Sequence, residues 1–155
     1  MSKQSKLDDF LPYLMNRVAA RMNQNLSEQL AVHGYTFQNW RILAALAAFD
    51  RVTLKELTEL TVLPQPSVSR NVADLEQMGL LKRNGNRSDL RVTEIALTAP
   101  GRQVYEKMRA IALQENTAAM KGISASERNQ MRKVLLRMME NRDVVLPRKS
   151  RVYPL

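Results

Sequence analysis

The sequence contains no cysteine, one histidine and five glycines. Without cysteine, the chain has no disulfide framework, no thiolate metal site and no thiol redox switch. There is no metal-ligand cluster, no glycine-rich phosphate loop and no serine beside an evident partner base, so the motifs of the common enzyme classes are missing. We therefore expect a protein that is not an enzyme and that uses neither a metal nor another cofactor.

Long apolar runs are missing as well. No stretch approaches the ~20 apolar residues that a membrane-spanning helix requires. The polar N-terminus, Met1 to Asp9, lacks the apolar centre of a secretory signal. The 155 residues are 45% hydrophobic and 25% charged, which is typical of a globular protein. These features predict a cytoplasmic protein with one domain, or with one domain and helical extensions.

Positive charge is what the chain has in excess. The net charge is +9, from 24 Lys and Arg against 15 Asp and Glu, and an excess of this kind favours a polyanion as partner. Residues 101–155 carry 12 basic and 5 acidic residues, so +7 of the total lies in the last third. The overall charge therefore does not locate a DNA-binding surface. The stretch from Lys82 to Arg91 is a better indicator, with four basic residues and one acidic residue.

Amphipathic helices are predicted at both ends of the chain. The first runs from Asp9 to Val32, with Asp8 or Asp9 as its N-cap and Gly34 as a left-handed residue after its end. Its apolar residues recur at three- and four-residue steps, which places them on one face. That face consists of Leu11, Leu14, Met15, Val18, Met22, Leu26 and Leu30.

Two more helices are predicted after the central region. Thr98 can cap a helix over 99–119, and the capping box Ser124–Glu127 begins a last helix that ends near Arg142. The apolar face of this last helix is too large for a free surface helix. It consists of Met131, Val134, Leu135, Met138 and Met139.

The centre of the chain predicts a helix-turn-helix. A buried helix over 37–49 is followed by two short helices over 54–61 and 66–78, joined by a tight turn. Their predicted start signals are the N-cap Thr36, the capping box Thr53–Glu56 and Pro66 in the first helical position. The inward side of the last helix is predicted to hold Val68, Val72, Leu75 and Met78, with Gly79 closing it.

A β-hairpin is predicted directly after this motif. Strands over 80–83 and 91–97 flank a polar turn over 84–89. The fold class is therefore mainly α with a small β-hairpin: a winged helix-turn-helix with N- and C-terminal dimerisation helices. The expected domain boundaries are 36–101 for the winged helix-turn-helix, and 1–35 together with 102–155 for the helical dimerisation region.

Four short segments in this order resemble the multiple-antibiotic-resistance regulator (MarR) family. They are Ser69-Arg70, Gly79-Leu80-Leu81-Lys82-Arg83, Asp89-Leu90-Arg91 and Leu97-Thr98-Ala99-Pro100-Gly101. The wing of this family often reads Asp-Arg-Arg, and Leu90 stands at the middle position here. The resemblance implies a homodimeric transcription regulator, expected to be a repressor, that binds a pseudo-palindromic double-stranded DNA operator.

Residue types that suit DNA occupy the predicted recognition helix and wing. Short polar groups and arginine can contact base edges in the major groove, and wing arginine can enter a narrow minor groove. The recognition-helix candidates are Gln65, Pro66, Ser67, Ser69, Arg70 and Asn71. The wing candidates are Arg83, Arg87, Asp89 and Arg91, with Asp89 expected to hold an arginine in place.

An effector site is expected between the dimer helices and the DNA-binding lobe, where the resemblance places such pockets. Arg17 borders the apolar face of the first helix and could bind the carboxylate of a small aromatic acid that releases the protein from its operator. Tyr13, His33 and Trp40 could add a polar and aromatic lining. A structural ion pair for Arg17, and core or loop roles for His33 and Trp40, stay open as alternatives. The alternative function is a winged-helix protein-interaction module without DNA binding.

Overall fold

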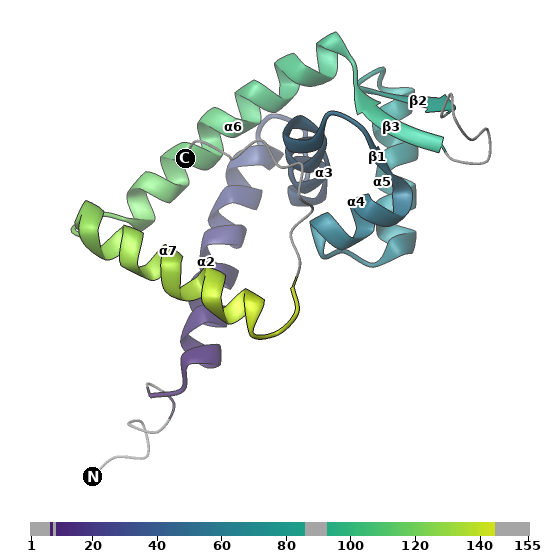
Figure 1. Ribbon diagram of the computed structural model, residues 1–155. Helices are drawn as coiled ribbons and strands as arrows, with labels where there is room; N and C mark the ends of the chain where they lie inside the picture. Colours follow the sequence, from purple (N-terminus) through teal and green to yellow (C-terminus); the bar gives the residue numbers. More distant parts are fainter. Residues whose placement is uncertain (1–6, 8, 86–92, 145–155) are drawn as a thin grey trace.

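The computed structural model describes residues 7, 9–85 and 93–144. Six helices and three short strands lie within these residues (Figure 1). Leu7, before the first of these helices, is also helical. The helices are α2 (Leu11–Ala31), α3 (Phe37–Phe49), α4 (Leu54–Thr61), α5 (Gln65–Gln77), α6 (Ala99–Ala119) and α7 (Ala125–Glu140). The strands are β1 (Val52–Thr53), β2 (Leu81–Gly85) and β3 (Thr93–Leu97).

Four of the predicted helix caps are present. The side chains of Thr36, Thr53, Thr98 and Ser124 each accept a hydrogen bond from a backbone N–H in the first turn of α3, α4, α6 and α7. Such a cap stabilises a helix by about 1 kcal/mol. The expected cap of the first helix was wrong, because its N-cap residue is Phe10, which makes no side-chain capping bond.

The sheet has one strand more than the predicted hairpin. Its order is β1-β3-β2, and both pairs are antiparallel. In the wing, Leu81 is paired with Leu97 and Gly85 with Thr93; at the other edge, Val52 is paired with Ile95. The strand β1 is two residues long, too short to produce a hydrophobic period that a sequence pattern could reveal.

The core lies between α3, α4, α5, the sheet and the first half of α6. Leu43, Leu46, Leu57 and Leu75 are fully buried there, and each contributes about 1.5–3 kcal/mol of transfer free energy. Met78 was expected to face this core but is 55% exposed. The cause is that the chain leaves the helix at this residue, the C-cap of α5, and turns away at Gly79.

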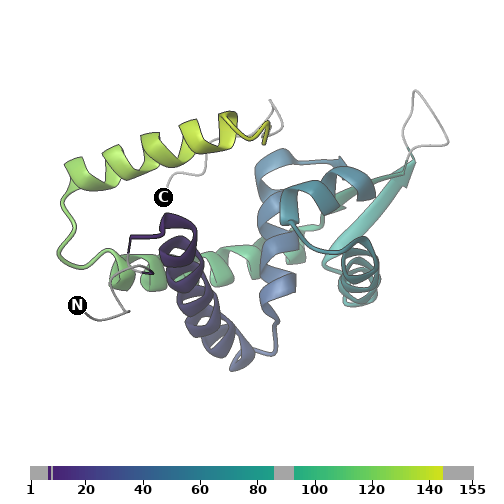
Figure 2. The same cartoon turned by 90° about the horizontal axis from the view of Figure 1, so that it is seen from below.

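The two end helices lie largely outside the core. Only Leu26 and Leu30 of α2 are buried, and no residue of α7 is. Figure 2 shows α7 standing apart from α2 and α6, and the turn that connects it to α6 contains Gly122. The apolar faces of both helices are therefore exposed in the single chain.

Candidate nucleic-acid interface

The first half of α5 presents a polar surface. Pro64 precedes the helix without a side-chain cap, so the backbone N–H groups of Gln65 and Ser67, on either side of Pro66, have no capping partner. The spacing of Val68, Val72 and Leu75, which are fully buried, places the opposite side of the helix in solvent. That exposed side carries Gln65, Pro66, Ser69 and Arg70, with Ser67 half-buried beside them.

Asn71 differs from the other recognition-helix candidates. It is half-buried, and its amide nitrogen donates to the carbonyl of Ser67 at 2.8 Å. Its amide oxygen accepts from the amide nitrogen of Asn39, on α3, at 3.2 Å. Asn39 also completes the capping box with Thr36. The Asn71 side chain therefore holds α5 against α3 and is not free toward solvent.

The base of the wing is fastened to α5 by an ion pair. The Nε of Arg83, on β2, lies 2.9 Å from a carboxylate oxygen of Glu76, and both side chains are about two-fifths exposed. This pair neutralises one of the two acidic residues in the second half of α5. Lys82 is exposed beside it. The other wing candidates, Arg87, Asp89 and Arg91, lie outside the described residues.

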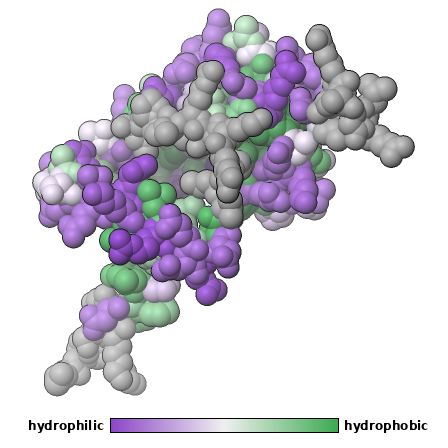
Figure 3. All heavy atoms as spheres, in the orientation of Figure 1, coloured by the Kyte–Doolittle hydropathy of each residue, from purple (hydrophilic) through white to green (hydrophobic). Residues whose placement is uncertain are grey.

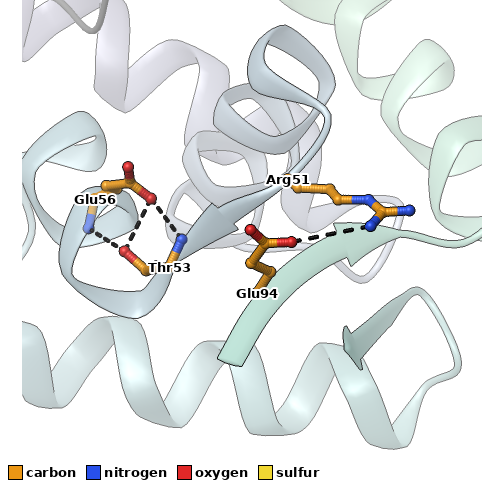
Figure 4. A network of polar contacts seen from close by, with 4 residues as sticks. All are labelled: Arg51, Thr53, Glu56 and Glu94. Atoms are coloured by element: carbon orange, nitrogen blue, oxygen red, sulfur yellow. Dashed lines mark hydrogen bonds and ion pairs between the residues drawn. The ribbon is translucent and has the colours of Figure 1, made fainter. Parts of the chain in front are cut away.

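A second set of contacts fastens the opposite edge of the sheet (Figure 4). A carboxylate oxygen of Glu94, on β3, lies 3.9 Å from the guanidinium of Arg51, which directly precedes β1. Thr53, the residue paired with Glu94 across the two strands, forms the capping box of α4 with Glu56. Because β1 leads directly into α4, this edge ties the wing to the helix-turn-helix. Sequence patterns predicted this capping box but missed the ion pair and the strand pairing, since each of these joins residues far apart in the chain.

The effector candidates are only partly brought together. The guanidinium carbon of Arg17 lies 5.9 Å from the ring centroid of Tyr13, one helical turn earlier on α2. Arg17 also borders an open groove of about 530 Å³ between α2 and α6. The groove is lined by Arg17, Val18, Arg21, Met22, Asn25, Glu115, Ala118 and Ala119. Within the described residues, no carboxylate forms an ion pair with Arg17 or Arg21.

His33 and Trp40 lie elsewhere. His33 is exposed just after the end of α2, about 20 Å from Arg17 along the helix axis. Trp40 stacks on Tyr105, with ring centroids 5.9 Å apart and planes 6° from parallel. Burial raises the pKa of the Tyr105 phenol above its ordinary value, so this hydroxyl stays protonated. The stack joins α3 to α6 and does not line the groove beside Arg17.

Exposed apolar surface gathers at the two end helices. Phe10, Leu11 and Val18 are each more than half exposed, and hydrophobic residues cover the start of α2 in Figure 3. On α7, Val134 is 51% and Met131 42% exposed. A second open groove, of about 550 Å³, lies in the elbow between α6 and α7. Monomeric proteins rarely expose so much apolar surface in one region.

A helix-turn-helix followed by a hairpin that packs on its last helix defines a winged helix-turn-helix protein. A family model described as MarR family matches residues 33–91, the part that contains α3, α4, α5 and the first wing strand. The resemblance to the MarR family of transcriptional regulators, which the four sequence segments indicate, is confirmed by this family model and by the similar proteins below.

Three similar proteins span most of the chain. The HTH-type transcriptional repressor IacR of Pseudomonas putida is 22% identical over 134 residues, which cover 86% of this chain and 80% of that protein. A MarR-family regulator from Silicibacter pomeroyi has 29% identity and a TM-score of 0.81, covering 96% and 95% of the two chains. CouR from Rhodococcus jostii, solved with p-coumaroyl-CoA bound, has 25% identity and a TM-score of 0.75, covering 83% and 91%.

Membrane-spanning helices and metal-binding clusters are both absent from the described residues. No helix among them is long and apolar enough to cross a membrane. No group of three or more His, Cys, Asp or Glu side chains in the same part of the chain could hold a metal ion. The similar proteins from Pseudomonas putida and Silicibacter pomeroyi are transcriptional regulators rather than enzymes.

Proposed function

We propose that this chain is a homodimeric transcription regulator that binds a specific double-stranded DNA operator through α5 and the wing. The observation that carries the proposal is the exposed first half of α5, where Gln65, Ser69 and Arg70 stand over a buried apolar side. Arginine and glutamine there suit guanine and adenine edges in the major groove. The backbone N–H groups at the start of α5 suit phosphate.

We propose different roles for the predicted contact residues. Gln65, Pro66, Ser67, Ser69 and Arg70 are proposed to face the DNA, and Asn71 to set the orientation of α5 through Asn39. Arg83 is proposed to hold the wing at the angle that brings its turn to the adjacent minor groove. Arg87, Asp89 and Arg91 keep their sequence-based assignment as wing contacts.

Selection of duplexes from a random library tests this proposal. The protein should enrich a pseudo-palindromic sequence, and its affinity for that sequence should fall steeply as salt rises, because arginine and lysine contacts release counterions. A protein-interaction module without DNA binding would enrich no sequence and would show no shift of duplex DNA at low salt. That outcome would replace the present proposal with the alternative one.

The dimer is proposed to form through α2, α6 and α7, with 36–101 as the DNA-binding domain and 1–35 and 102–155 as the dimerisation region. Support comes from the apolar faces of α2 and α7, which nothing covers within the described chain. Two-fold symmetry would place the two recognition helices one DNA turn, about 34–36 Å, apart. Sedimentation equilibrium at micromolar concentration should give twice the chain mass of 17.7 kDa. A species of 17.7 kDa at every concentration would refute the dimer.

Val134→Asp offers a sharper test of this surface. It places a charge on the apolar face of α7, where the side chain is 51% exposed in the single chain. We expect this variant to be monomeric, since an unpaired charge in an interface costs several kcal/mol. The neighbouring exposed residue Lys133, changed to Asp, is the control and should leave the dimer intact. The same oligomeric state in both variants would show that this face of α7 is not an interface.

A small anionic, aromatic ligand is proposed to act as effector in the α2–α6 groove. Arg17 and Arg21 supply positive charge at its rim, and apolar side chains such as Val18 and Met22 supply its wall. CouR, which shares the fold, was solved with p-coumaroyl-CoA, a larger anionic molecule that carries an aromatic acyl group, and this supports an aromatic ligand here. Repression that is relieved by the ligand is the regulatory outcome we propose, and the relative IacR is named as a transcriptional repressor.

Thermal unfolding in the presence of aromatic carboxylates tests this effector site. A ligand that binds the folded state raises the unfolding temperature by mass action. Arg17→Ala should abolish that rise and the ligand-induced release of DNA while keeping DNA affinity. His33→Ala, about 20 Å away along the helix, should keep both responses. An undiminished response in Arg17→Ala would show that Arg17 has a structural role.

A further inference from the structure

The start of α6 is joined to the turn between α5 and the wing by unusually direct contacts. The hydroxyl of Thr98 donates to the carbonyl of Gly79 at 2.7 Å, and its backbone N–H donates to the carbonyl of Leu80 at 3.0 Å. The same hydroxyl accepts from the N–H of Gly101 at 3.1 Å, as the cap of α6. One residue thus bonds to two consecutive carbonyls of the turn and to its own helix.

Gly101 brings the two segments still closer. A Cβ at this position would lie 1.9 Å from the carbonyl oxygen of Leu80, a backbone atom that cannot rotate away. Glycine is therefore the only residue that permits this approach between α6 and the turn. We call Thr98, Gly101 and their partners Gly79 and Leu80 the α6 junction.

The turn that contributes Gly79 and Leu80 to the α6 junction is closed by backbone hydrogen bonds of its own. The N–H of Leu80 donates to the carbonyl of Leu75, and the N–H of Gly79 donates to that of Glu76, each at 2.9 Å. With Gly79 in the left-handed conformation, φ +72°, this closes α5 as a Schellman motif. Since β2 begins at Leu81, the recognition helix, the wing and α6 all meet at these few bonds.

The helix α6 is a lever between this junction and the proposed dimer region. Its 21 residues span about 30 Å, from the sheet to the elbow where α7 begins (Figure 1). A rotation of about 10° at one end of such a lever displaces the other end by about 5 Å. This exceeds the ~3.4 Å between successive base pairs. The stiffness of the α6 junction therefore decides how sharply the distance between two recognition helices is defined.

We propose that the α6 junction sets the half-site spacing that the dimer accepts, so that Thr98 and Gly101 are positioning residues for operator specificity. The proposal rests on the proposed function, since it assumes that α5 reads DNA in a dimer. It assigns specificity to residues that touch no base, through the bonds of Thr98 to Gly79 and Leu80.

The test uses the selected operator and two versions with one base pair inserted or removed between the half-sites. The parent protein should bind the original spacing roughly tenfold more tightly than either altered spacing, the size of effect that a single poorly matched position produces. Thr98→Val removes the hydroxyl and should reduce this preference to about threefold or less. Thr98→Ser keeps both hydroxyl bonds and should restore it.

Two further variants separate the junction from the helix cap and from general stability. Thr98→Asp can still accept from the N–H of Gly101 but cannot donate to Gly79, so it should lose the spacing preference and keep the cap. Thr117→Val removes a hydroxyl of the same helix that bonds only to its own turn, at Leu113, and should keep the preference.

The outcomes distinguish the two proposals. A parent that binds no duplex refutes the proposed function and this inference with it. A parent that binds its operator but tolerates all three spacings refutes only the inference, as does a Thr98→Asp protein that binds duplex with the full preference. Loss of the preference in Thr117→Val would assign the effect to helix stability and would also overturn the inference.

Discussion

Gly101→Ala has two opposing effects on the stability of the protein, and their magnitudes decide whether it is stabilised or destabilised. In a helix interior alanine is favoured over glycine by about 1 kcal/mol, so helix propensity alone predicts a more stable protein. However, the added Cβ would lie 1.9 Å from the carbonyl oxygen of Leu80, whereas ordinary contacts of this kind exceed 3 Å. The start of α6 must then move away from the turn by more than 1 Å, on the order of a bond length.

Such a shift also stretches the bonds of Thr98 to Gly79 and Leu80, now 2.7 and 3.0 Å, beyond hydrogen-bonding distance. Two lost bonds at about 1 kcal/mol each, with a further 1–3 kcal/mol for overpacking, outweigh the gain in propensity. We expect Gly101→Ala to lower the free energy of unfolding by about 2–4 kcal/mol.

Urea unfolding followed by circular dichroism, at one fixed protein concentration, measures this difference. Gly85→Ala is the matched control, because a Cβ there would meet no atom within 4 Å. It should change the free energy of unfolding by less than about 0.5 kcal/mol. A Gly101→Ala protein as stable as the parent would refute the steric reasoning.

Three other changes test separate parts of the fold by the same unfolding measurement. Val62 is a β-branched residue in the left-handed conformation, at φ 52°, and is 77% exposed. Val62→Gly should therefore stabilise the protein by about 1 kcal/mol, and no gain would show that the backbone at Val62 is unstrained. Leu30→Ala should cost about 2–5 kcal/mol, since the fully buried Leu30 anchors α2 to the core, and a cost below 1 kcal/mol would contradict that role. Hydrogen bonds from Ser124 lower the pKa of Glu127, so the contribution of Glu127 to stability is present above the ordinary carboxyl pKa and is lost as pH falls through the lowered pKa. Glu127→Gln should remove this part of the acid dependence of unfolding. An unchanged acid dependence in the variant would assign it to other groups.

Sequence patterns predicted the local features of this fold well. The caps at Thr36, Thr53, Thr98 and Ser124 form within four residues, so the sequence next to each one specifies it. The left-handed glycines after α2, α5 and α6 follow the same logic. The resemblance to the MarR family was also predictable, because each of the four matching segments is short and contiguous.

Contacts between distant segments could not be predicted in the same way. The strand β1 forms because Val52 and Thr53 pair with Ile95 and Glu94, more than 40 residues later in the chain. The bond between Asn39 and Asn71 links α3 to α5 across 32 residues, and no local pattern indicates it. The separation of Trp40 from Arg17 likewise follows from how α3 packs on α6, where Tyr105 stacks on the indole.

The affinity of Arg70→Ala for the selected operator tests the central claim most directly. Fluorescence anisotropy at one salt concentration should show a loss of about 1–3 kcal/mol, or about 5- to 150-fold, if Arg70 contacts a base or phosphate. Lys121→Ala removes the same charge in the turn between α6 and α7 and should bind as the parent does. Equal affinity of the Arg70→Ala protein and the parent, with both proteins folded, would contradict the assignment of α5 as the DNA-reading helix.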